Sequence, residues 1–82
     1  MRDITQFNHW GLAEWLNERS KSSPGEELVA NVHYDDSWDI YYLDICEGSG
    51  QCLDTFNYMG EDEIIDDITE ANKQFNLKIE MI

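Results

Sequence analysis

The sequence predicts an α+β domain in the order α-β-β-β-α-β, with an antiparallel three-stranded meander, a C-terminal strand and two helices packed on the sheet. Two segments, one near the start of the chain and one over residues 60–76, place apolar residues at helical spacing. Three segments between them and one at the end are short and alternate in polarity, which is typical of strands. Eighty-two residues are enough for one small core, so residues 1–82 are expected to form a single domain.

The first helix is expected to begin near Asp3, whose side chain can cap it, with Gln6 three residues later as in a capping box. Its apolar stripe consists of Ile4, Phe7, Gly11, Leu12, Trp15 and Leu16. The segment SKSSPGEE at 20–27 then ends the helix, because serines, proline and glycine favour a loop.

Three strands are expected at 28–34, 38–46 and 52–59, and a glycine-rich EGSGQ turn separates the last two. A first hairpin centred between Asp36 and Ser37 places Leu43 and Ile45 on the core face. A second hairpin centred on Ser49 sets Asp44 directly across from Asp54, and Tyr42 across from Phe56, on the outer face. Two like charges opposite each other destabilise a sheet, so this pair suggests a functional role.

The second helix is expected over 60–76, and the C-terminal LKIEMI reads as an alternating strand. Its clean alternation is typical of a sheet that faces solvent on one side, which would put both helices on the core face. Trp38, Tyr42, Phe56 and Tyr58 would then form an exposed aromatic patch beside carboxylates. If one helix covers each face instead, the same aromatic residues belong to the core.

Charge is the dominant feature of the composition. Eighteen Asp and Glu against five Lys and Arg give a formal net charge of −13. Between residues 22 and 72 the chain has no Lys or Arg, although fourteen of the acids fall there. Direct binding to nucleic acid or to an anionic membrane is thereby disfavoured, and a basic partner is favoured.

The second helix carries the clearest acidic pattern. Glu63, Asp66, Asp67 and Glu70 follow i, i+3, i+4, i+7 spacing, which predicts one acidic stripe with neighbours about 5–6 Å apart. The helix dipole explains acids in the first turn, but it does not explain Asp67 and Glu70 further along. A merely solvated face remains the alternative, although such faces usually mix Lys with Glu.

No catalytic or metal motif appears in the sequence. The stretch DDSWD at 35–39 lacks the glycine and terminal Glu of a calcium loop, and no nucleophile elbow or phosphate loop is present. His9 and His33 are interpreted as surface or packing residues. We therefore expect no metal, no cofactor and no enzymatic activity.

Two cysteines, Cys46 and Cys52, are too few for a disulfide framework, and both are expected to be reduced. The chain has no apolar run of membrane-spanning length, and its start, MRDITQFNHW, has no signal-peptide core. These observations favour a cytoplasmic protein.

Small size, many unpaired acids and an αβ scaffold together resemble the small acidic DNA-mimic inhibitors of phage type, which include the uracil-DNA glycosylase inhibitor, acidic anti-CRISPR proteins and anti-restriction proteins. The resemblance lies in the composition of the whole chain. It implies a stoichiometric inhibitor that binds the basic nucleic-acid site of a nuclease, a glycosylase or a CRISPR effector in the cytoplasm of the host cell. An immunity protein against a nuclease toxin, an acidic adaptor subunit and a small metal-binding protein are the alternatives.

The residues expected to contact the partner combine the acids of the central hairpin, the outer-face aromatics and the acidic stripe. They are Asp35, Asp36, Trp38, Asp39, Tyr42, Asp44, Asp54, Phe56, Tyr58, Glu63, Asp66, Asp67 and Glu70. Monomer and homodimer both stay open, because an exposed aromatic face also suits self-association.

Overall fold

A computed structural model describes residues 4–82, and it confirms the predicted α+β class and element order. The elements are a 3-10 turn at Ile4–Gln6, α1 at Trp10–Ser22, β1 at Glu27–Asp35, β2 at Ile40–Glu47, β3 at Cys52–Tyr58, α2 at Glu61–Phe75 and β4 at Lys78–Met81.

The first helix begins later than the sequence predicts. A helix running on from Asp3 is wrong, because the 3-10 turn is followed by a break and α1 begins only at Trp10; Asp3 itself lies outside the described residues. His9 caps α1, since its Nδ1 accepts a hydrogen bond from the backbone N–H of Leu12 at 3.1 Å. That bond satisfies one of the N–H groups that a helix start leaves without a partner.

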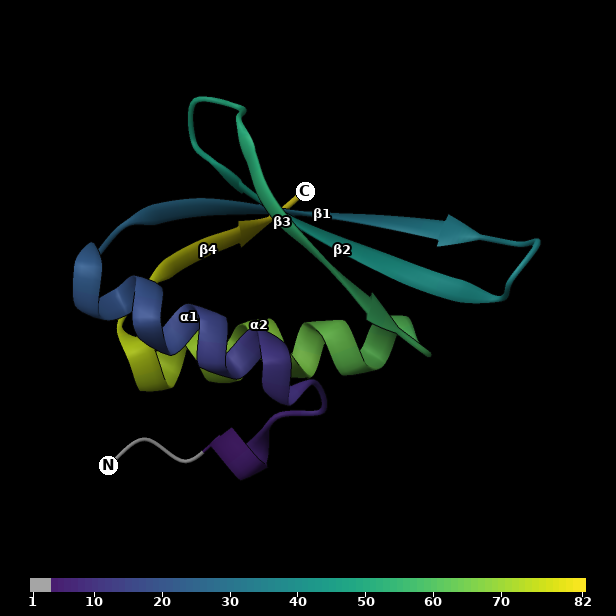
Figure 1. Cartoon of the computed structure of the whole chain (residues 1–82), viewed down its shortest axis with the longest axis horizontal. Coiled ribbons are helices and arrows are strands. Elements are labelled where there is room, and N and C mark those ends of the chain that lie inside the picture. Colours follow the sequence, from purple (N-terminus) through teal and green to yellow (C-terminus); the bar gives the residue numbers. More distant parts are fainter. Residues whose placement is uncertain (1–3) are drawn as a thin grey trace.

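The four strands form one mixed sheet in the order β3-β2-β1-β4, and both helices cover the same face of it (Figure 1). The expectation of one covered and one open face is therefore confirmed. Between the layers lies a core built from α1, α2 and the strands, with Leu12, Leu16, Leu43, Ile45 and Phe75 all buried. No helix of residues 4–82 has the length and apolar character needed to cross a membrane.

The β1–β2 hairpin has a longer turn than predicted, occupying residues 36–39. Ala30 therefore pairs with Ile45 rather than with Leu43, a shift of two residues along the partner strand. Because side chains alternate with a period of two, this shift leaves the same residues on the core face.

The register between β2 and β3 differs by one residue from the predicted one, which exchanges the two faces of β3. Leu43 pairs with Phe56 and Ile45 with Asp54, but Cys46 pairs with Cys52, so Leu53 is an extra residue in β3 and forms a β-bulge. The predicted pairings of Asp44 with Asp54 and of Tyr42 with Phe56 are both wrong. A one-residue shift exchanges the two faces of a strand, which is why Phe56 and Tyr58 point into the core.

A disulfide joins Cys46 and Cys52 across the paired strands and closes the turn between them. The expectation of two reduced thiols is therefore wrong for this structure. Spacing alone did not reveal the bond, because the two residues become cross-strand partners only through the register of the hairpin.

Candidate partner-binding surface

The described basic residues all lie at one end of the molecule. Arg19 and Lys21 occupy the last turn of α1, Lys73 the last turn of α2, and Lys78 begins β4. Figure 1 places these three element ends together, opposite the turn of the β1–β2 hairpin and the start of α2. We call the opposite end, with the turn of the β1–β2 hairpin and the start of α2, the hairpin end. Its carboxylates have no Lys or Arg nearby among residues 4–82.

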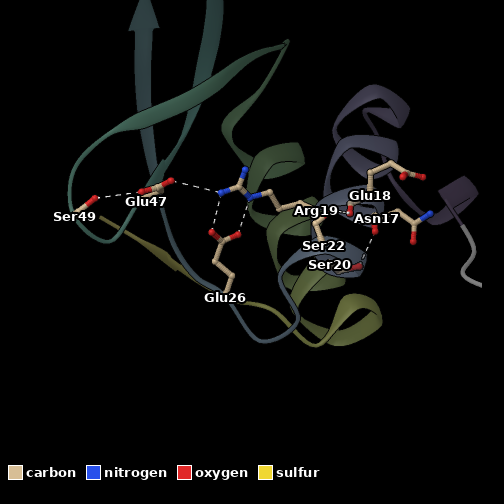
Figure 2. Close-up of polar contacts among 8 residues, drawn as sticks. All are labelled: Asn17, Glu18, Arg19, Ser20, Ser22, Glu26, Glu47 and Ser49. Atoms are coloured by element: carbon tan, nitrogen blue, oxygen red, sulfur yellow. Dashed lines mark hydrogen bonds and ion pairs between the residues drawn. The ribbon is translucent and has the colours of Figure 1, made fainter.

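At the basic end two of the four described basic residues, Arg19 and Lys21, form ion pairs. Arg19 donates two hydrogen bonds to the Glu26 carboxylate at 2.7 and 2.8 Å, and its guanidinium also lies 3.6 Å from a Glu47 oxygen (Figure 2). These bonds, which join the end of α1 to the start of β1 and the end of β2, lower the pKa of Glu26 and raise that of Arg19. Lys73 and Lys78 at this end are exposed and form no ion pair within residues 4–82, so this end carries positive as well as negative charge.

The turn of the β1–β2 hairpin extends past both helices (Figure 1). It carries Asp35, Asp36 and Asp39 around Trp38, whose side chain is 73% exposed. No ion pair within the described part of the chain involves these three carboxylates. Trp38 is therefore a large apolar side chain held in solvent between carboxylates that form no ion pair. The sequence predicts its exposure, but on the outer face of a strand that begins at residue 38 and not in a turn.

The turn is braced by its own side chains. Tyr34 packs on Tyr41 with ring centroids 4.8 Å apart, and its hydroxyl donates to Asp39 at 2.8 Å. That hydrogen bond is the main cause of the raised pKa of Tyr34. Asp35 accepts from the backbone N–H of Ser37 at 3.0 Å, and Asp39 closes the turn with a positive φ of 53°, which aspartate tolerates.

The start of α2 adds a second group of acids at the same end of the molecule (Figure 1). Glu61 and Asp62 in its first turn and Asp66 one turn later are exposed, and Glu63 is half-buried. Negative side chains stabilise a helix start through the helix dipole, so the acids of the first turn also have a structural role. Met59, directly before the helix, is 75% exposed and adds apolar area next to them.

The predicted acidic stripe of α2 is only partly correct. Glu70 is half-buried and accepts a hydrogen bond from Gln74, but Asp67 is fully buried. Asp67 lies between Ile64 and Ala71 on the face that packs on the sheet, so it does not belong to the outer surface. The helical spacing from Ile64 to Asp67 was the signal in the sequence that could have identified it.

Asp67 is instead a hydrogen-bonding centre inside the protein. One oxygen accepts from the backbone N–H of Asn8 at 2.7 Å and from its side chain at 3.2 Å. The other accepts from the His9 N–H at 3.0 Å and from the Tyr58 hydroxyl at 2.7 Å. Burial, followed by the bond to Asp67, raises the pKa of Tyr58 far above its ordinary value, so the phenol remains a donor.

Polar side chains at the centre of the open face of the sheet bond to one another. Asp44 lies across from Thr55, which donates to it at 2.6 Å, and His33 Nε2 lies 2.9 Å from its other oxygen. The like-charge pair expected of Asp44 and Asp54 is therefore absent, although Asp54 is exposed at a neighbouring position. Tyr42 is half-buried beside His33, its cross-strand partner.

The residues predicted to bind a partner thus fall into three groups. Those at the exposed hairpin end are Asp35, Asp36, Trp38, Asp39 and, from α2, Asp66. Tyr42, Asp44, Asp54, Glu63 and Glu70 lie on other or half-buried surface, and Phe56, Tyr58 and Asp67 are buried. The interpretation of Phe56 and Tyr58 as exposed aromatic residues is wrong.

Sequence reasoning missed Tyr34 and Met59 as exposed members of this end, and it explained Glu61 and Asp62 by the helix dipole alone. Strand alternation assigns Tyr34 to the helix-facing side, but β1 extends beyond the helices there and its ring remains half-exposed. Tertiary packing determines how far a hairpin extends beyond the helices that cover its sheet, and no local sequence pattern predicts this distance.

One other feature lies away from this end. A hollow of about 560 Å³ is lined by the first residues of β1, by Gly48 and by β4, and its charged residues include both signs, Lys78 beside Glu27 and Glu80. Within residues 4–82 no group of three or more His, Cys, Asp or Glu side chains is placed to hold a metal ion.

Comparisons of the chain with models of protein families, with curated proteins and with solved structures found no match.

Proposed function

We propose that this protein is a stoichiometric inhibitor that occupies the basic nucleic-acid-binding site of a DNA- or RNA-processing protein. It would act by binding and without catalysis, as a phage anti-defence protein such as an anti-CRISPR protein does. Its setting would be the cytoplasm of the host cell, where such a partner works.

One observation carries this proposal: the separation of charge along the molecule. Carboxylates of the hairpin turn and of α2 that form no ion pair gather at one end, whereas the described Lys and Arg lie at the other. A nucleic-acid site presents Lys and Arg that release counterions when they are neutralised. A rigid surface of carboxylates offers the same neutralisation, and its field orients the approaching molecule with the acidic end first.

Specificity requires more than charge, because charge complementarity mainly raises the association rate. Exposed Trp and Tyr are the residue types that most often supply binding energy at interfaces. Trp38 and Tyr34 lie among the acids of the hairpin turn, and Met59 precedes those of α2. The same end therefore offers both the charge and the apolar anchors that a specific complex needs.

The test is capture from nuclease-treated host lysate, followed by competition with the purified partner. We expect DNA or RNA to displace the protein from its partner in a salt-dependent manner. Simultaneous binding of nucleic acid and protein to the partner would contradict the proposal.

A matched pair of charge-reversal variants locates the surface. The first carries Asp36→Lys, Asp62→Lys and Asp66→Lys, all exposed at the hairpin end, and should lose inhibition. The control carries Glu18→Lys, Glu27→Lys and Glu80→Lys, all exposed on other surfaces, and changes the net charge equally. Equal loss in both variants would mean that total charge, and not this surface, determines binding.

A further inference from the structure

The indole of Trp38 is displayed in a way that folding alone does not explain. It is 73% exposed, and the bracing contacts of the turn are made by Tyr34, Asp35 and Asp39 rather than by Trp38 itself. A smaller polar residue would fit the turn at least as well, because an exposed indole gains little burial on folding.

The surroundings of Trp38 place a flat aromatic ring between anionic groups. Asp36 lies two residues before it and Asp39 follows it directly, and neither carboxylate has a Lys or Arg partner among residues 4–82. Alternating ring and anion is also the chemical pattern of a single nucleic-acid strand, in which bases stack and phosphates pair with cations.

The narrow shape of the hairpin also resembles a single nucleic-acid strand. The arm is two strands wide, and paired strands lie about 4.8 Å apart, so its turn is narrow compared with a helix. It extends beyond both helices, which leaves the turn accessible from several sides (Figure 1). Such a turn can enter a channel that admits one strand, whereas a duplex-binding groove would be filled better by a broad surface.

We propose that the hairpin turn imitates a nucleotide of a single strand, with the Trp38 indole in place of a base and Asp36 and Asp39 in place of the flanking phosphates. This inference rests on the proposed function and specifies its partner as a protein that stacks bases on the planes of aromatic side chains. The binding site of that partner would alternate such planes with basic side chains.

The chemistry of the turn can be tested with two peptide probes of equal positive charge, one alternating Arg with Tyr and the other alternating Arg with Ala. We expect the Arg–Tyr peptide to bind the full-length protein roughly 5- to 150-fold more tightly at low salt, as one stacking contact provides. Fluorescence titration or calorimetry measures both affinities.

Two tryptophan variants provide the matched comparison, because Trp10 is also exposed, on α1. Trp38→Ala should abolish the preference for the Arg–Tyr peptide, and Trp10→Ala should retain it. Equal binding of both peptides, or a preference that survives in Trp38→Ala, would overturn the assignment of Trp38 while leaving charge-based inhibition intact. Failure of both peptides to bind at low salt would count against the proposed function as well.

In the competition assay with a captured partner, a single-stranded oligonucleotide should displace the protein more effectively than a duplex of the same length. Displacement by the duplex alone would keep the proposed function and reject the single-strand inference. Displacement by neither would reject both.

Discussion

Replacing Asp67 with Asn is expected to destabilise the protein even though it removes a negative charge from a chain with a net charge of −13. In the native structure one oxygen accepts from the His9 N–H and from the Tyr58 hydroxyl. If the amide NH₂ takes that position, the Tyr58 hydroxyl can rotate and accept from it. The His9 N–H cannot, and it is left without a partner.

The magnitude follows from three contributions. An unsatisfied buried donor costs about 1–3 kcal/mol. The hydrogen bonds that remain become weaker, because bonds to a charged group are roughly twice as strong as neutral ones. The interaction of the carboxylate with the start of α1 adds about 0.3–1 kcal/mol. Together these predict a loss of about 2–4 kcal/mol in the free energy of unfolding.

Urea unfolding at pH 7 and fixed salt measures this loss, and Asp66→Asn is its control. Asp66 is the exposed neighbour, so its substitution makes the same change in charge and should alter stability by no more than about 0.5 kcal/mol. If Asp67→Asn proved as stable as Asp66→Asn, relief of charge repulsion would outweigh the buried hydrogen bonds. The structural role assigned to Asp67 would then be refuted.

Three further predictions concern the rest of the molecule. Because Arg19 lowers the pKa of Glu26, the ion pair should stabilise the fold above the ordinary glutamate pKa and lose this effect as the pH falls. Glu26→Gln should therefore lower the free energy of unfolding by about 1 kcal/mol at pH 7 and by little at pH 3. An equal loss at both pH values would contradict this prediction. The double substitution Cys46→Ser/Cys52→Ser removes a closed loop of seven residues and should cost about 2 kcal/mol by chain entropy, while inhibition of the partner is retained in a binding assay. Raising salt from about 10 to 200 mM should raise the melting temperature, since screening weakens repulsion among the acids; an unchanged value would mean that their repulsion is negligible.

The sequence predicted the element order and the covered face because those depend on periodicity. Alternation in LKIEMI indicated a sheet open on one side, and the helices do share a face. The exposure of Trp38 and its neighbouring acids was also predicted, since a stretch rich in Asp and Ser is exposed whatever the exact register.

The registers of the strands, and the hydrogen-bond partners of the buried Asp67, could not be predicted from the sequence, for physical reasons. The sequence EGSGQ allows more than one residue at the centre of the hairpin turn. The bulge at Leu53 determines that Phe56 and Tyr58 lie on the core face of the sheet. The spacing from Ile64 indicates the buried face for Asp67, but it does not show which donors other segments bring to that carboxylate. Three of its four donors belong to Asn8 and His9, which lie almost sixty positions earlier in the chain.

The parallel pairing of β4 with β1 has a consequence for how the chain folds. The β1–β2–β3 meander joins neighbouring residues, but Glu27 pairs with Lys78, 51 residues later. Closing so large a loop is slow, and contacts of this kind form late. The hairpin that carries Trp38 should thus take shape before the sheet is complete. A substitution in β4 such as Ile79→Ala should then accelerate unfolding more than it slows refolding, which stopped-flow kinetics would show.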